Sequence, residues 1–251
     1  MKKITFVIFI LLFALGSMAS ENQLIIAKAN KAYSDGLYTN AADLYKQVIT
    51  SGYSSWELYY NLGNTYYKLN DFPSAILYYE KAKKLNPGNE DIDFNLKVTN
   101  NKISDKIEPL PELFYKQWYR GLVESFPVDT WSWIVIIAFI LAMGSASVFI
   151  ISRRVIIRKT SFWLGVLLFV LSLCSFLFAY QNYQTLNNNS AAIIFAPTVT
   201  VKSSPDEKSI DLFVLHEGTK VQIIDNIGVW YEIRISSGSI GWLPSSTVEK
   251  I

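Results

Sequence analysis

The chain has 251 residues, of which 51% are hydrophobic and 18% are charged, whereas about 25% of the residues in an ordinary soluble domain are charged. This composition, with a mean hydropathy of +0.21, indicates segments suited to lipid. The 23 basic and 21 acidic residues nearly cancel, which argues against a nucleic-acid partner. One histidine and one cysteine exclude an internal disulfide and a Cys/His zinc site. We therefore expect no catalytic residues, no metal and no other cofactor.

Residues 1–19 have the organisation of a secretory signal peptide. Lys2 and Lys3 precede an apolar run from Ile4 to Leu15, and small residues follow it up to Ala19. A helix of this apolar length spans about 18 Å, which is less than the roughly 30 Å of a hydrocarbon core. We expect cleavage after Ala19. An uncleaved membrane anchor is the alternative.

A repeat of 34 residues follows over residues 22–105. Shifting the chain by one repeat places Tyr45 on Tyr79, for example. The second unit resembles the tetratricopeptide repeat in residues at the expected spacings: Tyr59, Leu62, Gly63, Tyr66, Ala75, Tyr79, Ala82 and Pro87. We expect the small side chains at Gly63 and Ala75 to permit a close crossing of the two helices of that unit. The third unit is expected to keep only its first helix.

The tetratricopeptide resemblance implies a groove on the inner face of the first helix of each repeat, where a segment of a partner protein binds. We expect this groove to be lined by Asn30, Tyr33, Tyr60, Asn61, Asn64, Tyr67 and Asn95. The positions that carry cations in the carboxylate-clamp subfamily hold Ile26, Asp91 and Asn95 here, so a clamp for a C-terminal carboxylate is not expected. Phenols and amides favour a neutral or mildly apolar peptide. Alternatively, some of these tyrosines only pack between helices.

The segment 109–127 has an amphipathic pattern of its own. Leu113, Phe114, Trp118 and Leu122 recur at helical spacing, and charged residues occupy the remaining arc. We expect an interfacial helix that lies on the outer surface of the membrane. A helix packed on the last repeat is the alternative.

Two segments, 130–152 and 161–183, are long and apolar enough to cross a membrane. The expected loop between them, 153–159, contains four cations and no acid: Arg153, Arg154, Arg158 and Lys159. The positive-inside rule predicts that this loop is cytoplasmic, so the regions before and after the two spans lie in the periplasm. We therefore expect a two-pass protein of the bacterial inner membrane. A buried core hairpin is the alternative.

After an expected linker, 184–196, the pattern changes to short alternating runs separated by turns. The runs predict five strands in residues 197–251, and five short strands indicate a small barrel. They start at Val199, Leu212, Val221, Trp230 and Ile240.

The C-terminal region resembles the bacterial SH3-like domain, through the run from Gly228 to Ile233 and the Gly241-Trp242-Leu243 element. Such domains bind cell-wall peptides or partner peptides. The resemblance therefore implies that Trp230 and Trp242 form the floor of a shallow groove, and purely structural tryptophans are the alternative. His216 precedes a glycine turn and is expected to be a turn or surface residue.

The order of these segments resembles the BatE-type proteins of the Bacteroides aerotolerance operon over essentially the whole chain. The resemblance implies that the partners are other Bat proteins. These are membrane-anchored proteins with von Willebrand A-type domains and a further tetratricopeptide protein, with a MoxR-type ATPase on the cytoplasmic side.

The fold class predicted from the sequence is a multidomain membrane protein. It combines an α-helical tetratricopeptide solenoid, two transmembrane helices and a C-terminal all-β SH3-like barrel. Three function classes follow. The leading one is a non-enzymatic scaffold that presents both modules in the periplasm. The second is a sensor whose barrel binds cell-wall peptide, and the third is an enzyme with a carboxylate mechanism, for which no paired acids converge in the sequence pattern.

Overall fold

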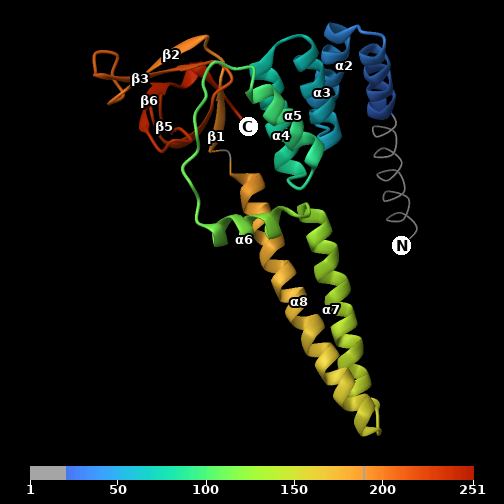
Figure 1. Ribbon diagram of the computed structural model, residues 1–251. Helices are drawn as coiled ribbons and strands as arrows, with labels where there is room; N and C mark the ends of the chain where they lie inside the picture. Colours follow the sequence, from blue (N-terminus) through green and yellow to red (C-terminus); the bar gives the residue numbers. More distant parts are fainter. Residues whose placement is uncertain (1–20, 189) are drawn as a thin grey trace, which may run out of the picture. The chain divides into compact units, whose positions relative to one another are not determined.

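A computed structural model describes residues 21–188 and 190–251 of the chain (Figure 1). The described residues divide into two compact units. Unit 1 contains the described residues up to Lys83 together with residues 90–110 and 190–251. Unit 2 contains residues 84–89 and 111–188. The expected signal peptide lies outside the described residues.

The first part of unit 1 is helical. Residues 21–34 are helical, and they are followed by α2 (Tyr38–Thr50), α3 (Trp56–Lys68), α4 (Phe72–Leu85) and α5 (Glu90–Asn100) (Figure 1). Ser55 caps α3, because its side chain accepts a hydrogen bond from the Leu58 amide at 3.2 Å. The Asp71 carboxylate accepts one from the Ser74 amide at 3.1 Å at the start of α4, and Pro87 follows the end of that helix.

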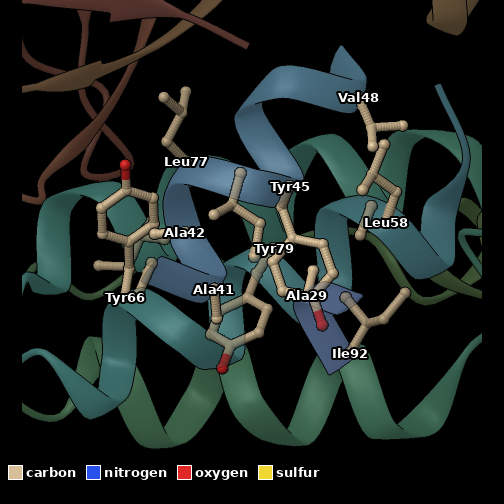
Figure 2. Close-up of a cluster of buried hydrophobic side chains, with 14 of the residues drawn as sticks. Ala29, Ala41, Ala42, Tyr45, Val48, Leu58, Tyr66, Leu77, Tyr79 and Ile92 are labelled. Carbon is tan, nitrogen blue, oxygen red and sulfur yellow. The ribbon is translucent and has the colours of Figure 1, made fainter. Parts of the chain in front are cut away.

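The two helices of the second repeat cross closely at Gly63, as the sequence predicts. A Cβ atom added at Gly63 would lie 2.6 Å from Cδ1 of Tyr79, and Ala75 is fully buried. Figure 2 shows the buried cluster, in which the hydroxyl groups of Tyr45 and Tyr79 point to one side and that of Tyr66 to the other. After α5, residues 101–113 form neither helix nor strand.

Unit 2 contains α6 (Phe114–Glu124), α7 (Val128–Ile151) and α8 (Val155–Asn187), and α7 and α8 run antiparallel side by side (Figure 1). Both α7 and α8 are long and apolar enough to cross a membrane. The connection between them is shorter than the expected loop 153–159. Residues 155–159 already belong to α8, because neither glycine nor proline interrupts the helix at its start.

Within unit 2, α6 is hydrogen-bonded to the first turn of α7 and to the last turns of α8. The side-chain amide of Asn182 donates hydrogen bonds to the carbonyl oxygens of Val123 at 3.0 Å and Phe126 at 3.1 Å. The Trp131 indole N–H also donates to the Val123 carbonyl, at 3.0 Å. The Tyr119 hydroxyl donates to Gln181 Oε1 at 2.6 Å. These hydrogen bonds fix α6 at that end of the helical pair.

The rest of unit 1 is one antiparallel sheet of seven strands in the order β3-β2-β6-β5-β4-β1-β7. Its strands are β1 (Ala191–Ile194), β2 (Thr198–Lys202), β3 (Asp211–His216), β4 (Lys220–Ile227), β5 (Trp230–Arg234), β6 (Ile240–Pro244) and β7 (Val248–Lys250). The five predicted strands correspond to β2–β6. Val201, Ile233 and Leu243 are fully buried between them.

The expected linker 184–196 is largely structured, which corrects the sequence analysis. Its first residues continue α8 to Asn187, and β1 occupies 191–194. β1 pairs with β4 on one side and β7 on the other. With four and three residues, β1 and β7 are too short for an alternating pattern to reveal them.

Candidate functional site

A hydrogen-bond pattern recurs at the 34-residue period on the inner face of the repeats. The Tyr45 hydroxyl donates to Asn30 Oδ1 at 2.6 Å, and the Tyr79 hydroxyl donates to Asn64 Oδ1 at 2.7 Å. In both pairs the asparagine lies on the first helix of a repeat, and the tyrosine lies 15 residues later on the second helix. Each buried tyrosine therefore orients one amide on the inner face.

Asn95 on α5 extends this pattern into the third unit. Its Nδ2 donates to the Tyr60 hydroxyl and to Asn64 Oδ1, both at 2.9 Å. Asn64 Oδ1 thus accepts two hydrogen bonds. No described residue forms a hydrogen bond with Asn64 Nδ2 or Asn95 Oδ1, so one donor and one acceptor remain for a ligand.

A cavity of about 200 Å³ lies beside these amides. Its lining combines phenols, amides and one cation: Tyr33, Asn64, Tyr67, Lys68, Tyr79, Asn95, Val98 and Thr99. Four of the seven predicted groove residues thus meet in one place. A volume of this size suits one side chain of a bound peptide, because pockets for whole small molecules are larger, at about 300–1,000 Å³.

Burial disfavours the charged form of three tyrosines of the repeats, and two of them, Tyr33 and Tyr79, line the cavity. Burial raises the pKa of Tyr33, with smaller contributions from Tyr38 and Tyr60. Burial also raises the pKa of Tyr79 far above its ordinary value, and it raises the pKa of Tyr45 to about 12. A neutral phenol both donates and accepts hydrogen bonds, so these rings add hydrogen-bonding capacity without negative charge.

The other three predicted groove residues lie outside the cavity lining. Asn30 is exposed and accepts the hydrogen bond from Tyr45. Tyr60 is half-buried, its ring centroid is 5.9 Å from that of Tyr79, and its hydroxyl accepts the hydrogen bond from Asn95. Asn61 is half-buried on the same helix. Four residues of the lining, Lys68, Tyr79, Val98 and Thr99, were not predicted from the sequence, although the 15-residue spacing from asparagine to tyrosine marks Tyr79.

The two tryptophans of the predicted barrel groove share one face of the sheet. Trp242 is paired with Glu232 in the β5–β6 register, and Trp230 lies two residues earlier in β5. Trp242 is only 9% exposed, however, and Trp230 is half-buried. Lys202, which is paired with Trp242 from β2, lies on this face with a side chain that is only 19% exposed. Trp230 is therefore the more accessible of the two indoles.

A polar cluster inside unit 1 joins the end of the helical region to the β-domain, and the sequence analysis did not predict it. The Asp105 carboxylate accepts hydrogen bonds from the His216 amide at 2.8 Å and from the Thr219 hydroxyl at 2.7 Å, and it lies 2.7 Å from His216 Nδ1. Burial alone would raise the pKa of Asp105, but these hydrogen bonds outweigh burial and lower it. His216 precedes the turn with a side chain that is 40% exposed, as expected, and it is in addition paired with Asp105.

The comparisons with known proteins identify two modules. Residues 56–89 match the family model of the tetratricopeptide repeat, and residues 197–249 match that of the bacterial SH3 domain. No curated protein matches the chain. Both kinds of module are typically non-catalytic and bind proteins or peptides. Within the part of the chain that the structure describes, no group of three or more His, Cys, Asp or Glu residues is placed to hold a metal ion.

Proposed function

We propose that the protein is a non-enzymatic scaffold of the bacterial inner membrane. It crosses the membrane twice through α7 and α8, and it holds the tetratricopeptide region and the SH3-like domain in the periplasm. The observation that carries this proposal is the cavity on the inner face of the repeats. There, Asn64 Nδ2 and Asn95 Oδ1 offer a donor and an acceptor beside neutral phenol rings.

The partner is a segment of another membrane protein. Because the lining is mainly amide and phenol, it suits a neutral or mildly apolar peptide that presents one side chain to the cavity. The order of the segments supports membership of an aerotolerance-type (Bat) complex, in which von Willebrand A-type Bat proteins are the partners. In this arrangement α6 lies on the outer surface of the membrane.

The test is capture of partners by crosslinking in the native membrane. Tyr33→Ala with Tyr67→Ala removes two rings from the cavity lining. Because central aromatic residues of an interface contribute about 2 kcal/mol or more on truncation, we expect the double variant to weaken capture by more than about tenfold. Tyr53→Ala is the matched control, since Tyr53 is a tyrosine that is 41% exposed outside the cavity. Undiminished capture by the double variant would overturn the proposal.

The alternative function is a cell-wall-peptide sensor that acts through the SH3-like domain. The match of residues 197–249 to the bacterial SH3 domain supports it. Trp230→Ala is the informative change, because truncating the buried Trp242 would also damage the fold. Retention by isolated cell wall that is lost in Trp230→Ala would favour the sensor. Loss of membrane partners in Trp230→Ala alone would identify the barrel as the recognition module and the repeats as a spacer.

A further inference from the structure

A second pocket lies at the end of unit 2 where α7 meets α8. Its volume is about 380 Å³. Phe149 of α7 forms one wall, and residues from the first turns of α8 form the others: Val155, Arg158, Lys159, Phe162 and Trp163. None of these residues belongs to the cavity on the repeats.

In the wall that α8 contributes, the two cations lie one helical turn before the two aromatic residues. Residues four apart on a helix lie one turn, or about 5.4 Å, from each other on the same face. Arg158 therefore lies one turn before Phe162, and Lys159 lies one turn before Trp163. The Phe162 ring is 5.7 Å from that of Phe149 and 5.6 Å from that of Trp163. Both cations thus border one continuous aromatic surface.

The cations of this pocket have no carboxylate partner along the helical pair. The sequence contains no Asp or Glu between Asp129 and Asp206, so α7 and α8 carry no acid beyond the first turn of α7. The Arg158 guanidinium lies 5.1 Å from the centre of the Phe149 ring, and that contact leaves its charge uncompensated. A membrane-spanning pair therefore presents here a net positive site next to an apolar wall, and anionic headgroups are attracted to such sites.

We propose that this pocket binds one anionic phospholipid of the leaflet at this end of the helices. The phosphate pairs with Arg158 and Lys159, and an acyl chain lies along Phe149, Phe162 and Trp163. The proposal rests on the two membrane spans of the proposed function. It assigns α7 and α8 a lipid-binding role that partner recognition by the repeats does not require.

The test uses the full chain in phosphatidylcholine vesicles that contain a trace of spin-labelled phosphatidylglycerol or spin-labelled phosphatidylcholine. Electron paramagnetic resonance measures the fraction of each lipid that the protein immobilises. We expect phosphatidylglycerol to be enriched, and R158Q with K159Q to lower this enrichment at least about fivefold, which is the effect of one cation near a membrane surface. R153Q with R154Q removes the same charge from the same end but outside the pocket, so most of the enrichment should remain. W163L keeps both cations and should also reduce enrichment.

Three results would overturn the proposal. Equal losses in the two double variants would show that diffuse charge alone attracts the lipid, and the absence of enrichment with the unaltered chain would exclude the pocket. Competition by millimolar inorganic phosphate would indicate an ion site in place of a lipid site. Protease protection in the same vesicles reports insertion separately. An inserted chain without lipid preference contradicts only this proposal, whereas a chain that does not insert contradicts the membrane scaffold as well.

Discussion

At the scale of single residues, two helical glycines differ in whether their surroundings leave space for a side chain. A Cβ at Gly63 would lie 2.6 Å from the ring of Tyr79, which is 1% exposed and donates a hydrogen bond to Asn64. A Cβ at Gly121, on α6, would meet nothing within 4 Å. The first glycine is needed for close packing, and the second is not.

This contrast predicts opposite effects of the same substitution. Gly63→Leu should lower the free energy of unfolding of the repeats by about 1–3 kcal/mol, because the Tyr79 ring must move. Gly63→Ala should also destabilise, despite the helix propensity of alanine. Gly121→Ala should be neutral or stabilise by up to about 1 kcal/mol. Thermal unfolding of the purified full chain measures all three, and unchanged melting of Gly63→Leu would contradict the repeat assignment.

Asp105 makes the stability of unit 1 depend on pH in the acidic range. Its pKa is lower in the folded chain than in the unfolded chain, so its contribution to stability is present above the unfolded pKa and is lost as pH falls through the folded one. We expect Asp105→Ala to cost about 1–3 kcal/mol near pH 7, because it leaves Thr219 and the His216 amide unpaired. It should also flatten the loss of stability below about pH 4, near the ordinary pKa of an aspartate.

A pH series of denaturant unfolding checks this prediction. Glu217→Ala is the control, since Glu217 is an exposed carboxylate next to His216. If Glu217→Ala changes the acid dependence as much as Asp105→Ala does, the hydrogen bonds of Asp105 are not its source.

At the scale of elements, α6 has two different apolar faces. Tyr119 and Val123 face α8, where the Tyr119 ring lies 6.1 Å from that of Phe178 and Val123 is 3% exposed. Phe114 and Trp118 are 81% and 72% exposed. Because α6 is hydrogen-bonded to α8 at Gln181 and Asn182, its exposed face lies at the level where a membrane-spanning α8 leaves the lipid.

We therefore predict that Trp118 enters the membrane interface and that Lys116 does not. A nitroxide on cysteine at position 118 or 116, in a Cys174→Ser background, should collide mainly with oxygen at 118 and mainly with a water-soluble nickel complex at 116 in phosphatidylcholine vesicles. Equal access of the nickel complex at both positions would show that α6 lies in water.

Sequence periodicity predicts the long elements and fails on the short ones. The uninterrupted apolar runs of α7 and α8 identify those helices by their length, and the alternation in β2–β6 extends over enough residues to define a period. β1 and β7 do not, because β1 is held by pairing with β4 and β7 is held by pairing with β1, and neither depends on a pattern of its own. The predicted loop 153–159 failed for another reason, since charge does not end a helix.

The same limit applies to the candidate site. The tetratricopeptide spacing predicts Tyr33, Asn64, Tyr67 and Asn95, because one helical face repeats at a fixed interval. The contact of Asp105 with His216 joins residues 111 apart in the chain, and no local pattern reports such a pairing. The burial of Trp242 likewise depends on strands on both sides of β6.

At the scale of the whole molecule, the antiparallel arrangement of α7 and α8 determines where the regions before and after them would lie if both helices cross a membrane. The start of α7 at Val128 and the end of α8 at Asn187 lie at the same end of the pair (Figure 1). If both helices cross a membrane, the chain before α7 and the chain after α8 therefore lie on the same side of it. The opposite end carries Arg153, Arg154, Arg158 and Lys159 without an acid, and this bias predicts that it stays in the cytoplasm.

Reporter insertions test this orientation at three points. Reporters inserted at Asn100 and fused after Ile251 should both behave as exported, and one inserted at Ser152, between the spans, should behave as cytoplasmic. Changing Arg153, Arg154, Arg158 and Lys159 to glutamine should give the Ile251 fusion a mixed orientation, because the charge bias that retains this end is removed. A cytoplasmic signal from either Asn100 or Ile251 in the unaltered chain would contradict the proposed periplasmic scaffold, because at least one of the two modules would then lie inside the cell.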